Sequence, residues 1–187
     1  TALNPLFSIG DQIAEVIELH QGAPRAQAWK RATELLASTG IAEAERRAAA
    51  YPHQLSGGQR QRAMIAMALA CRPKLLLADE PTTALDVTVR QQILGLLADL
   101  QREHQMAVLM ITHDLNLVRR FADRVAVMEH GVLVEQGAVD EVFARPQHPY
   151  TRKLLDSRPV REVVEVQPGA ATAKPLLSAQ GLRVVYP

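Results

Sequence analysis

Hydrophobic residues in the first third of the chain recur at the spacing of an α-helix. The pattern runs from residue 9 to about residue 36 and is interrupted at Gly22 and Pro24, which predicts two consecutive helices. Residues 59–70 are apolar on nearly all sides. A helix of that kind is buried against its neighbours. The first 70 or so residues therefore predict a helical subdomain built around one buried helix.

The middle of the chain changes from helical spacing to short, continuous apolar runs. Residues 75–78 and 108–111 are two such runs, and residues 89–100 between them carry apolar side chains on one helical face. Continuous apolar runs are typical of parallel strands, and two of them joined by a helix form a right-handed crossover unit. This segment predicts a parallel sheet flanked by helices.

The last third of the pattern predicts a hairpin and two short helices. Residues 124–128 and 132–136 read as strands on either side of a turn, in which Gly131 supplies a positive φ angle. Residues 140–144 and 149–155 read as short closing helices.

Composition limits the class of protein. The chain has 187 residues, of which 48% are hydrophobic, so it can build the core of one ordinary domain. Its 21 basic and 20 acidic residues give a net charge of +1, which favours neither nucleic acid nor anionic lipid as a partner. No stretch approaches the roughly 18–20 apolar residues that cross a bilayer, so we expect a soluble or peripheral protein. The single cysteine, Cys71, predicts a buried structural thiol.

Both ends of the sequence look like the ends of a fragment. The chain begins at Thr1 without an initiator methionine, and residues 182–187 form an apolar strand pattern that stops as it begins. Residues 160–174 have neither helical nor strand period, which is typical of a linker. A new strand is predicted from about residue 176. We therefore expect this chain to be an internal piece of a longer protein.

The most specific local motif is Leu-Ser-Gly-Gly-Gln at residues 55–59, at the start of the predicted buried helix. A serine and two glycines at a helix N-terminus leave several backbone N–H groups unpaired and sterically open, which suits a phosphate oxygen. The alternative is an ordinary helix cap on a flexible loop. The complete five-residue motif, followed by Arg-Gln-Arg, favours the phosphate interpretation.

Two carboxylates end the first predicted strand. Asp79 and Glu80 follow the apolar run directly, and the carboxyl ends of parallel strands are where such sheets bind ligands. Asp79 suits a Mg²⁺ contact, because Mg²⁺ prefers one or two carboxylates together with phosphates and water. Glu80 could orient or deprotonate an attacking water. The alternative is a solvated strand end that carries acidic residues for solubility.

A histidine ends the second predicted strand, and an aspartate begins the helix between the two strands. His113 could donate a hydrogen bond to a γ-phosphate, since an imidazole is an adaptable donor near neutral pH. The alternative is a local cap, but two adjacent strands that end in polar groups favour the functional interpretation. Asp86 is expected to cap the helix that begins near Val87, whether or not it has a further role.

The order of these four motifs resembles the ATP-binding-cassette (ABC) ATPases. Residues 1–158 are similar to the second half of one cassette, with a helical subdomain at about 9–70 and a catalytic α/β part at about 71–158. Residues 71–88 resemble the dipeptide, oligopeptide and nickel importer group, as do the first five residues and His-Pro-Tyr-Thr at 148–151. The implied fold class is α/β: a partial P-loop NTPase (ABC cassette) fold with a helical subdomain, lacking the Walker A half.

The resemblance implies that two cassettes dimerise head to tail around ATP and Mg²⁺. Asp79 would bind the metal of this cassette's own ATP, at which Glu80 and His113 would be catalytic. The residues implied to meet the ATP of the partner, or to lie across the dimer interface, are Ser56, Gly57, Gly58, Gln59 and Asp86. No Gly-x-x-x-x-Gly-Lys-Ser/Thr motif occurs in the chain, so the cradle of N–H groups that holds the phosphates is missing. We expect the chain alone to be inactive.

The resemblance also implies partners and a place in the cell. It implies the ATP-hydrolysing subunit of an importer of peptides or similar small solutes, on the cytoplasmic face of the inner membrane. Its partners would be a second cassette, two transmembrane permease subunits and, indirectly, an external solute-binding protein, with no nucleic acid. Residues 159–174 would link this cassette to a second one, whose first strand would be residues 175–187.

Two alternatives to the importer remain open at the level of sequence. One is a non-transport ABC protein that acts as a nucleotide-switched binding module on ribosomes or DNA. Proteins of that kind usually carry long coiled-coil or charged insertions, and this chain has neither. The other is a degenerate cassette that does not hydrolyse ATP, against which the presence of Glu80 and His113 argues.

Overall fold

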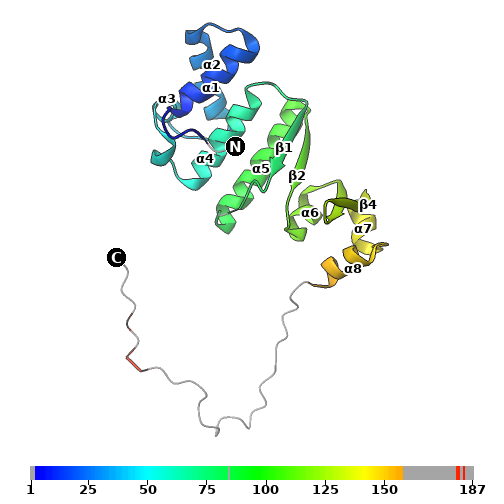
Figure 1. Ribbon diagram of the computed structural model, residues 1–187. Coiled ribbons are helices and arrows are strands. Elements are labelled where there is room, and N and C mark those ends of the chain that lie inside the picture. The colour runs from blue at the N-terminus through cyan, green and yellow to red at the C-terminus, as the bar shows by residue number, and fades with distance from the viewer. Residues whose placement is uncertain (1–2, 84, 158–179, 182, 184–187) are drawn as a thin grey trace.

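The computed structural model describes residues 3–83, 85–157, 180–181 and 183 (Figure 1). The first half contains α1 (Ile9–Gln21), α2 (Arg25–Ser38), α3 (Ala44–Ala48), the short 3-10 helix η1 (Pro52–Gln54) and α4 (Gly57–Leu69). The second half contains β1 (Leu75–Asp79), α5 (Val87–His104), β2 (Ala107–Ile111), α6 (Leu115–Phe121), β3 (Arg124–Glu129), β4 (Val132–Ala138), α7 (Val139–Ala144) and α8 (Pro149–Asp156).

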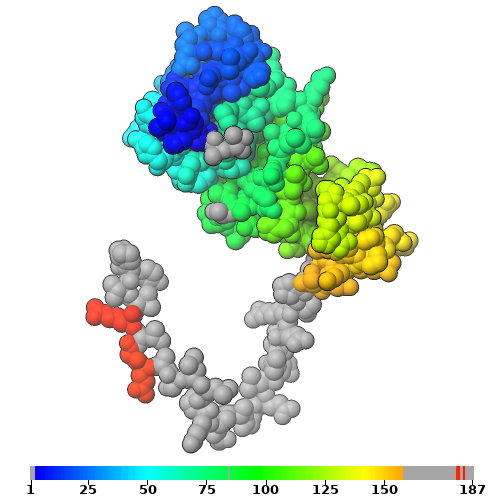
Figure 2. All heavy atoms as spheres, in the orientation of Figure 1, coloured from blue at the N-terminus to red at the C-terminus, as the bar shows by residue number. Residues whose placement is uncertain are grey.

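The described elements follow one another through space much as they do along the chain. Helices α1–α4 form one end, β1, β2 and α5 lie in the middle, and the β3–β4 hairpin with α7 and α8 forms the other end (Figures 1 and 2). The helices, strands and hairpin predicted within residues 9–155 are present.

The helical end is held together by apolar side chains at helical spacing. Ile9, Ile13 and Ile17 of α1 are fully buried and share one core with Leu36 of α2. Helix α4 adds Ala63, Ile65, Ala66 and Leu69 to the same core. Burying a large aliphatic side chain stabilises a fold by about 1.5–3 kcal/mol, so these helices form a firm support for the loop that precedes α4.

Strands β1 and β2 pair in parallel, as predicted, in a register that runs from Leu75 opposite Ala107 to Asp79 opposite Ile111. Leu76 on one face of β1 joins the core with Ile93 and Leu97 of α5. The other face of the sheet is uncovered by any described residue, although helices were expected to flank it. Its side chains are 51% (Leu75), 65% (Leu77), 51% (Leu109) and 55% (Ile111) exposed.

The β3–β4 hairpin turns at His130 and Gly131, both with positive φ angles of 49° and 81°. Gly131 adopts this conformation without steric cost, as the sequence predicted. Helix α7 continues directly from β4, and its Val139 and Val142 are buried. The nitrogen Nδ1 of His148 accepts a hydrogen bond from the backbone N–H of Tyr150 (3.3 Å) and so caps α8.

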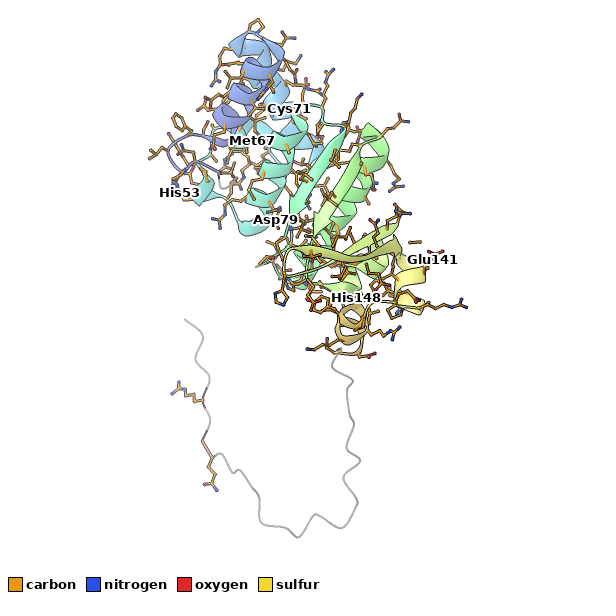
Figure 3. All side chains as sticks on the ribbon, turned by 45° about the vertical axis from the view of Figure 1, so that its right-hand side comes forward. His53, Met67, Cys71, Asp79, Glu141 and His148 are labelled. Carbon is orange, nitrogen blue, oxygen red and sulfur yellow. The ribbon has the colours of Figure 1, made fainter. Side chains whose placement is uncertain are left out.

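The prediction of a buried thiol at Cys71 is wrong. Helix α4 ends at Leu69, and Cys71 lies beyond it in a turn that Arg72 completes with a φ angle of 48° (Figure 3). The turn rotates the side chain away from the buried face of the helix, and the thiol is exposed.

Two expectations concern the chain as a whole. No helix among the described residues is long and apolar enough to cross a membrane. The predicted linker at 159–174 lies outside the described residues, and so does the predicted strand at 175–187 apart from Gln180, Gly181 and Arg183. The proposed division of residues 1–158 into a helical and a catalytic part stays a prediction.

Candidate nucleotide site

The parallel pairing brings the two polar strand ends to one edge of the sheet. Asp79, the last residue of β1, lies opposite Ile111, the last residue of β2, and the backbone N–H of Glu80 donates to the carbonyl of Ile111 at 2.9 Å. His113 follows two residues later. The structure therefore brings the side chains of Glu80 and His113 into contact and places Asp79 (Figure 3) at the same pair of strand ends.

Glu80 is held by two hydrogen bonds and by an unusual backbone. Its Oε1 lies 2.7 Å from Nδ1 of His113, and its Oε2 accepts from the hydroxyl of Thr83 at 2.6 Å. Its φ angle is 47°, in the left-handed region that a residue with a side chain rarely adopts. Strain of this kind costs roughly 1–3 kcal/mol and is typical of functional sites.

These contacts keep the Glu80 carboxyl ionised. The hydrogen bond from Thr83 lowers the pKa of Glu80, and the hydrogen bond and positive potential from His113 lower it further. The contact with Glu80 uses Nδ1 of His113, which leaves Nε2 as the ring nitrogen that can meet a ligand. Because the His113 side chain is 79% exposed, a bound phosphate could reach it.

Asp79 fits the chemistry of a Mg²⁺ ligand. Its carboxylate is exposed at the end of β1, and a single carboxylate together with phosphate oxygens and water is a common arrangement for this metal. The described residues contain no group of three acidic, histidine or cysteine side chains that could hold a metal alone. A metal at Asp79 would therefore take most of its ligands from a nucleotide and from water.

The loop before α4 forms a complete helix cap. The hydroxyl of Ser56 accepts from the N–H of Gln59 (3.3 Å), and the side-chain oxygen of Gln59 accepts from the N–H of Ser56 (3.1 Å). The cap that was considered as an alternative is therefore present. The N–H groups of Gly57 and Gly58, in the first turn of α4, have no intrahelical partner by position and remain available to an anion.

Asp86 caps α5, as predicted. Its Oδ1 accepts from the N–H of Val89 at 2.9 Å. The first turn of α5 also lies against the first turn of α4, since a Cβ added to Gly58 would lie 2.7 Å from Cγ1 of Val89. Only glycine fits there without displacement of a neighbour.

The site residues form two groups. Within the described part of the chain, no hydrogen bond or ion pair joins residues 56–59 to Asp79, Glu80 or His113.

The sequence did not single out Thr83 or Arg90, which contact Glu80 and Asp114. Thr83 lies three residues after Glu80, and this short separation could have indicated a contact between their side chains. Arg90 pairs with Asp114, 24 residues away, and no local pattern indicates that contact.

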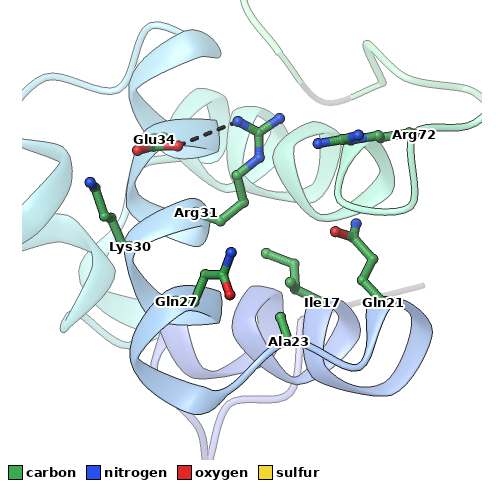
Figure 4. A pocket seen from close by; sticks show the side chains of 8 residues that line it. All are labelled: Ile17, Gln21, Ala23, Gln27, Lys30, Arg31, Glu34 and Arg72. Atoms are coloured by element: carbon green, nitrogen blue, oxygen red, sulfur yellow. Dashed lines mark hydrogen bonds and ion pairs between the residues drawn. The ribbon is translucent and has the colours of Figure 1, made fainter.

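A pocket lies elsewhere in the described part of the chain. A hollow of about 250 Å³ lies among α1, α2 and the turn after α4 (Figure 4). It is lined by Ile17, Gln21, Ala23, Gln27, Lys30, Arg31, Glu34 and Arg72. None of the predicted site residues lines it, so it is not part of the candidate nucleotide site.

Comparison with known proteins identifies the family. Residues 1–83 match the family "ABC transporter", and residues 134–174 match the family "Oligopeptide/dipeptide transporter, C-terminal region". The chain belongs to the ABC transporter ATPases of the oligopeptide/dipeptide group. The predicted partial ABC cassette fold is thereby confirmed.

Relatives of this chain include two curated transport proteins. It is 56% identical over 188 aligned residues to the peptidoglycan transport ATP-binding protein YejF of Agrobacterium fabrum, covering 100% of this chain and 34% of the relative. It is 57% identical over 159 residues to the glutathione import ATP-binding protein GsiA of Escherichia coli, covering 85% of this chain and 26% of that protein. The chain thus spans about a third or less of the length of these relatives.

Solved cassettes share the fold. The ATP-binding cassette MJ0796, solved as a dimer in a post-hydrolysis state with ADP and Pi, superposes with a TM-score of 0.63 at 37% identity. The match covers 73% of this chain and 59% of that one. The protein cbiO1 of Clostridium perfringens, part of the ABC transporter complex cbiONQ, gives a TM-score of 0.63 at 34% identity and covers 74% and 54%.

Proposed function

We propose that this chain carries the Leu-Ser-Gly-Gly-Gln loop and the catalytic strand ends of an ATPase that drives the import of peptides or similar small solutes. The observation that carries the proposal is the pair formed by Glu80 and His113 at the end of β1 and β2. The match to an oligopeptide/dipeptide transporter region and the names of the peptidoglycan and glutathione relatives support the transported class. They favour an importer over a cassette that acts on ribosomes or DNA.

In this proposal the strand-end residues divide the work of hydrolysis. A water oxygen bonds to the γ-phosphorus of ATP while the bond from that phosphorus to its bridging oxygen breaks. The ionised Glu80 carboxylate orients the water and takes its proton. His113, in its imidazolium form with Nδ1–H donated to Glu80, donates from Nε2–H to a γ-phosphate oxygen. Asp79 would hold Mg²⁺, which when bound neutralises charge on the phosphates.

The Leu-Ser-Gly-Gly-Gln loop at residues 55–59 serves a different nucleotide. The free N–H groups of Gly57 and Gly58 at the start of α4 suit the phosphate of an ATP held by a second cassette, with Ser56 and Gln59 beside them. Asp86 lies at the start of α5, on the loop that would meet the second cassette. The dimeric state of MJ0796 supports this arrangement. Because the chain has no P-loop motif, we expect it to bind ATP weakly and not to hydrolyse it alone.

The wider assembly is part of the same proposal. The cassette would pair with a second one in the same polypeptide, consistent with the greater length of YejF and GsiA. It would dock on two permease subunits at the cytoplasmic face of the inner membrane, and an external solute-binding protein would deliver the solute.

Substitutions at Glu80 and Asp79 test the proposal in the full-length ATPase. Glu80→Gln should lower kcat by about 100-fold or more, as expected for loss of a general base, while ATP binding is retained. Asp79→Asn should instead weaken Mg-ATP binding. Steady-state hydrolysis and calorimetric titration separate the two effects.

A matched control is available at the end of another strand. Glu129 is the last residue of β3 and has no assigned part in hydrolysis. Glu129→Gln should leave both kcat and ATP affinity unchanged. If Glu80→Gln and Asp79→Asn lost equal affinity, the division of roles between the two carboxylates would be wrong.

A further inference from the structure

The loop that carries His113 is anchored on both sides of the histidine. The backbone N–H of Asp114 donates to the hydroxyl of Thr112 at 3.1 Å. The Oδ1 of Asp114 accepts from the N–H groups of Asn116 (2.9 Å) and Leu117 (3.4 Å), and so caps α6. The position of His113 therefore depends on where Asp114 is held.

Arg90 of α5 contacts the second carboxylate oxygen of that residue. Its Nη1 lies 3.3 Å from Oδ2 of Asp114, and the two side chains are 35% and 25% exposed. The backbone N–H of Arg90 donates to the carbonyl of Asp86 at 2.9 Å. This ion pair thus ties the first turn of α5 to the loop of His113.

Stability alone is a poor reason to keep Arg90 here. Its Nε is buried and has no hydrogen-bond partner among the described residues. An unsatisfied buried donor costs about 1–3 kcal/mol, and removing partly buried charges from water offsets much of the attraction of an ion pair. An apolar side chain of similar length would fill the space without that cost. The ion pair instead fixes the position and orientation of the Asp114 side chain relative to α5.

We propose that Arg90 is a positioning residue for His113 and acts through its ion pair with Asp114. The inference rests on the proposed function, in which His113 contacts the γ-phosphate. Without Arg90, His113 would still be present but would be held less precisely for the step in which the γ-phosphate is released. Misplacement of a reacting group by about 1 Å can cost about 100-fold in rate.

The test uses the full-length ATPase with Arg90→Met and Asp114→Asn. Methionine keeps much of the stem of Arg90, and asparagine keeps an oxygen that can cap α6. Each variant should lower kcat by about 10- to 100-fold, with unchanged KM for ATP and unchanged Tm. The double variant should lose no more than either single variant, and Arg90→Lys should restore most of the rate.

Arg102 provides the matched control on the same helix. Its guanidinium pairs with Asp99 in solvent and its side chain is 78% exposed. Arg102→Met should leave kcat unchanged. Losses that multiply in the Arg90→Met, Asp114→Asn double variant, or a loss of rate that follows a lower Tm, would overturn the inference.

A second comparison separates this inference from the proposed function. In single turnovers with excess enzyme, Arg90→Met should add nothing to the loss caused by His113→Ala. If Arg90→Met lowered the single-turnover rate by the same factor in the His113→Ala variant as in the wild type, Arg90 would not act through His113. Wild-type kcat in His113→Ala would overturn the proposed function itself. A normal loss in His113→Ala together with wild-type kcat in Arg90→Met would overturn only the role of Arg90.

Discussion

At the scale of single residues, the environment of Glu80 combines a strained backbone with two hydrogen bonds to its carboxylate. The hydroxyl of Thr83 and the ring of His113 each bond a different oxygen of Glu80. Both contacts favour the charged form. The Glu80 carboxyl is thus ionised near neutral pH and can accept a hydrogen bond from a water molecule. Its low pKa makes it a weak base for removing a proton from that water. Orientation of the water is therefore a large part of its expected role.

Removal of the Thr83 hydroxyl should raise the pKa of Glu80 toward its ordinary value. Because the Thr83 hydrogen bond is the largest cause of the lowered pKa, Thr83→Val should give a shift that NMR titration of the Glu80 carboxyl resolves. Glu135 is an internal control, since its pKa is lowered chiefly by the backbone N–H of Gln147 and should not move. An unchanged Glu80 titration in Thr83→Val would contradict the assigned cause.

The same shift has a defined effect on stability. A carboxyl whose pKa is lowered by folding contributes stability above its unfolded-state pKa and loses it as the pH falls through the folded-state pKa. The wild-type protein should therefore be more stable than Thr83→Val at neutral pH through this effect. The contribution of Glu80 to the difference should disappear once the pH is below the folded-state pKa of Glu80.

At the scale of elements, the N-termini of α4 and α5 are packed against each other through glycine. The methyl group of an alanine at position 58 would lie 2.7 Å from Cγ1 of Val89, whereas one at position 57 would lie 3.4 Å from Cδ2 of Leu85. Val89 is β-branched and cannot rotate away easily. The two adjacent glycines therefore differ in how much space surrounds them.

Gly58→Ala should destabilise the full-length ATPase by about 1–3 kcal/mol, the usual cost of overpacking. Gly57→Ala is the matched control and should cost little, because its methyl group makes an ordinary contact. Addition of Val89→Ala should recover part of the loss in Gly58→Ala by removing the clash. Thermal and denaturant unfolding measure all three variants, and equal losses at positions 57 and 58 would argue against this packing.

At the scale of the whole molecule, one face of the β1–β2 sheet exposes large apolar side chains that no described helix covers. Leu75, Leu77, Leu109 and Ile111 are each at least half exposed. Contiguous apolar surface of this kind favours association or further coverage. The cassette MJ0796, of which this chain matches 59%, is correspondingly larger.

The chain by itself should therefore self-associate through this face. Leu77→Thr combined with Leu109→Thr should reduce both dye binding by apolar surface and the apparent mass in light scattering, because threonine keeps β propensity while it removes apolar area. Leu19→Thr is the control, since Leu19 is 74% exposed on α1, in the helical end of the molecule. A larger effect from Leu19→Thr than from the sheet pair would contradict the assignment.

The sequence by itself determined the features that depend on interactions between residues close together in the chain. Helix and strand positions, the Asp86 cap and the Gly131 turn depend on residues within a few positions of one another, so their patterns predicted them. The prediction that Cys71 is buried was wrong, because the apolar residues that precede it do not show where α4 ends. The helix ends at Leu69, and the turn that follows exposes the thiol.

Tertiary structure alone decided the contacts that join distant segments. Sequence indicated that Glu80 and His113 would lie at the same edge of a sheet. Only the register of β1 and β2 brought their side chains to 2.7 Å across 33 positions. The pairing of Arg90 with Asp114, and the contact between Gly58 and Val89, likewise depend on how α5 sits between α4 and β2. Such packing is set by the joint burial of apolar faces, which no local pattern encodes.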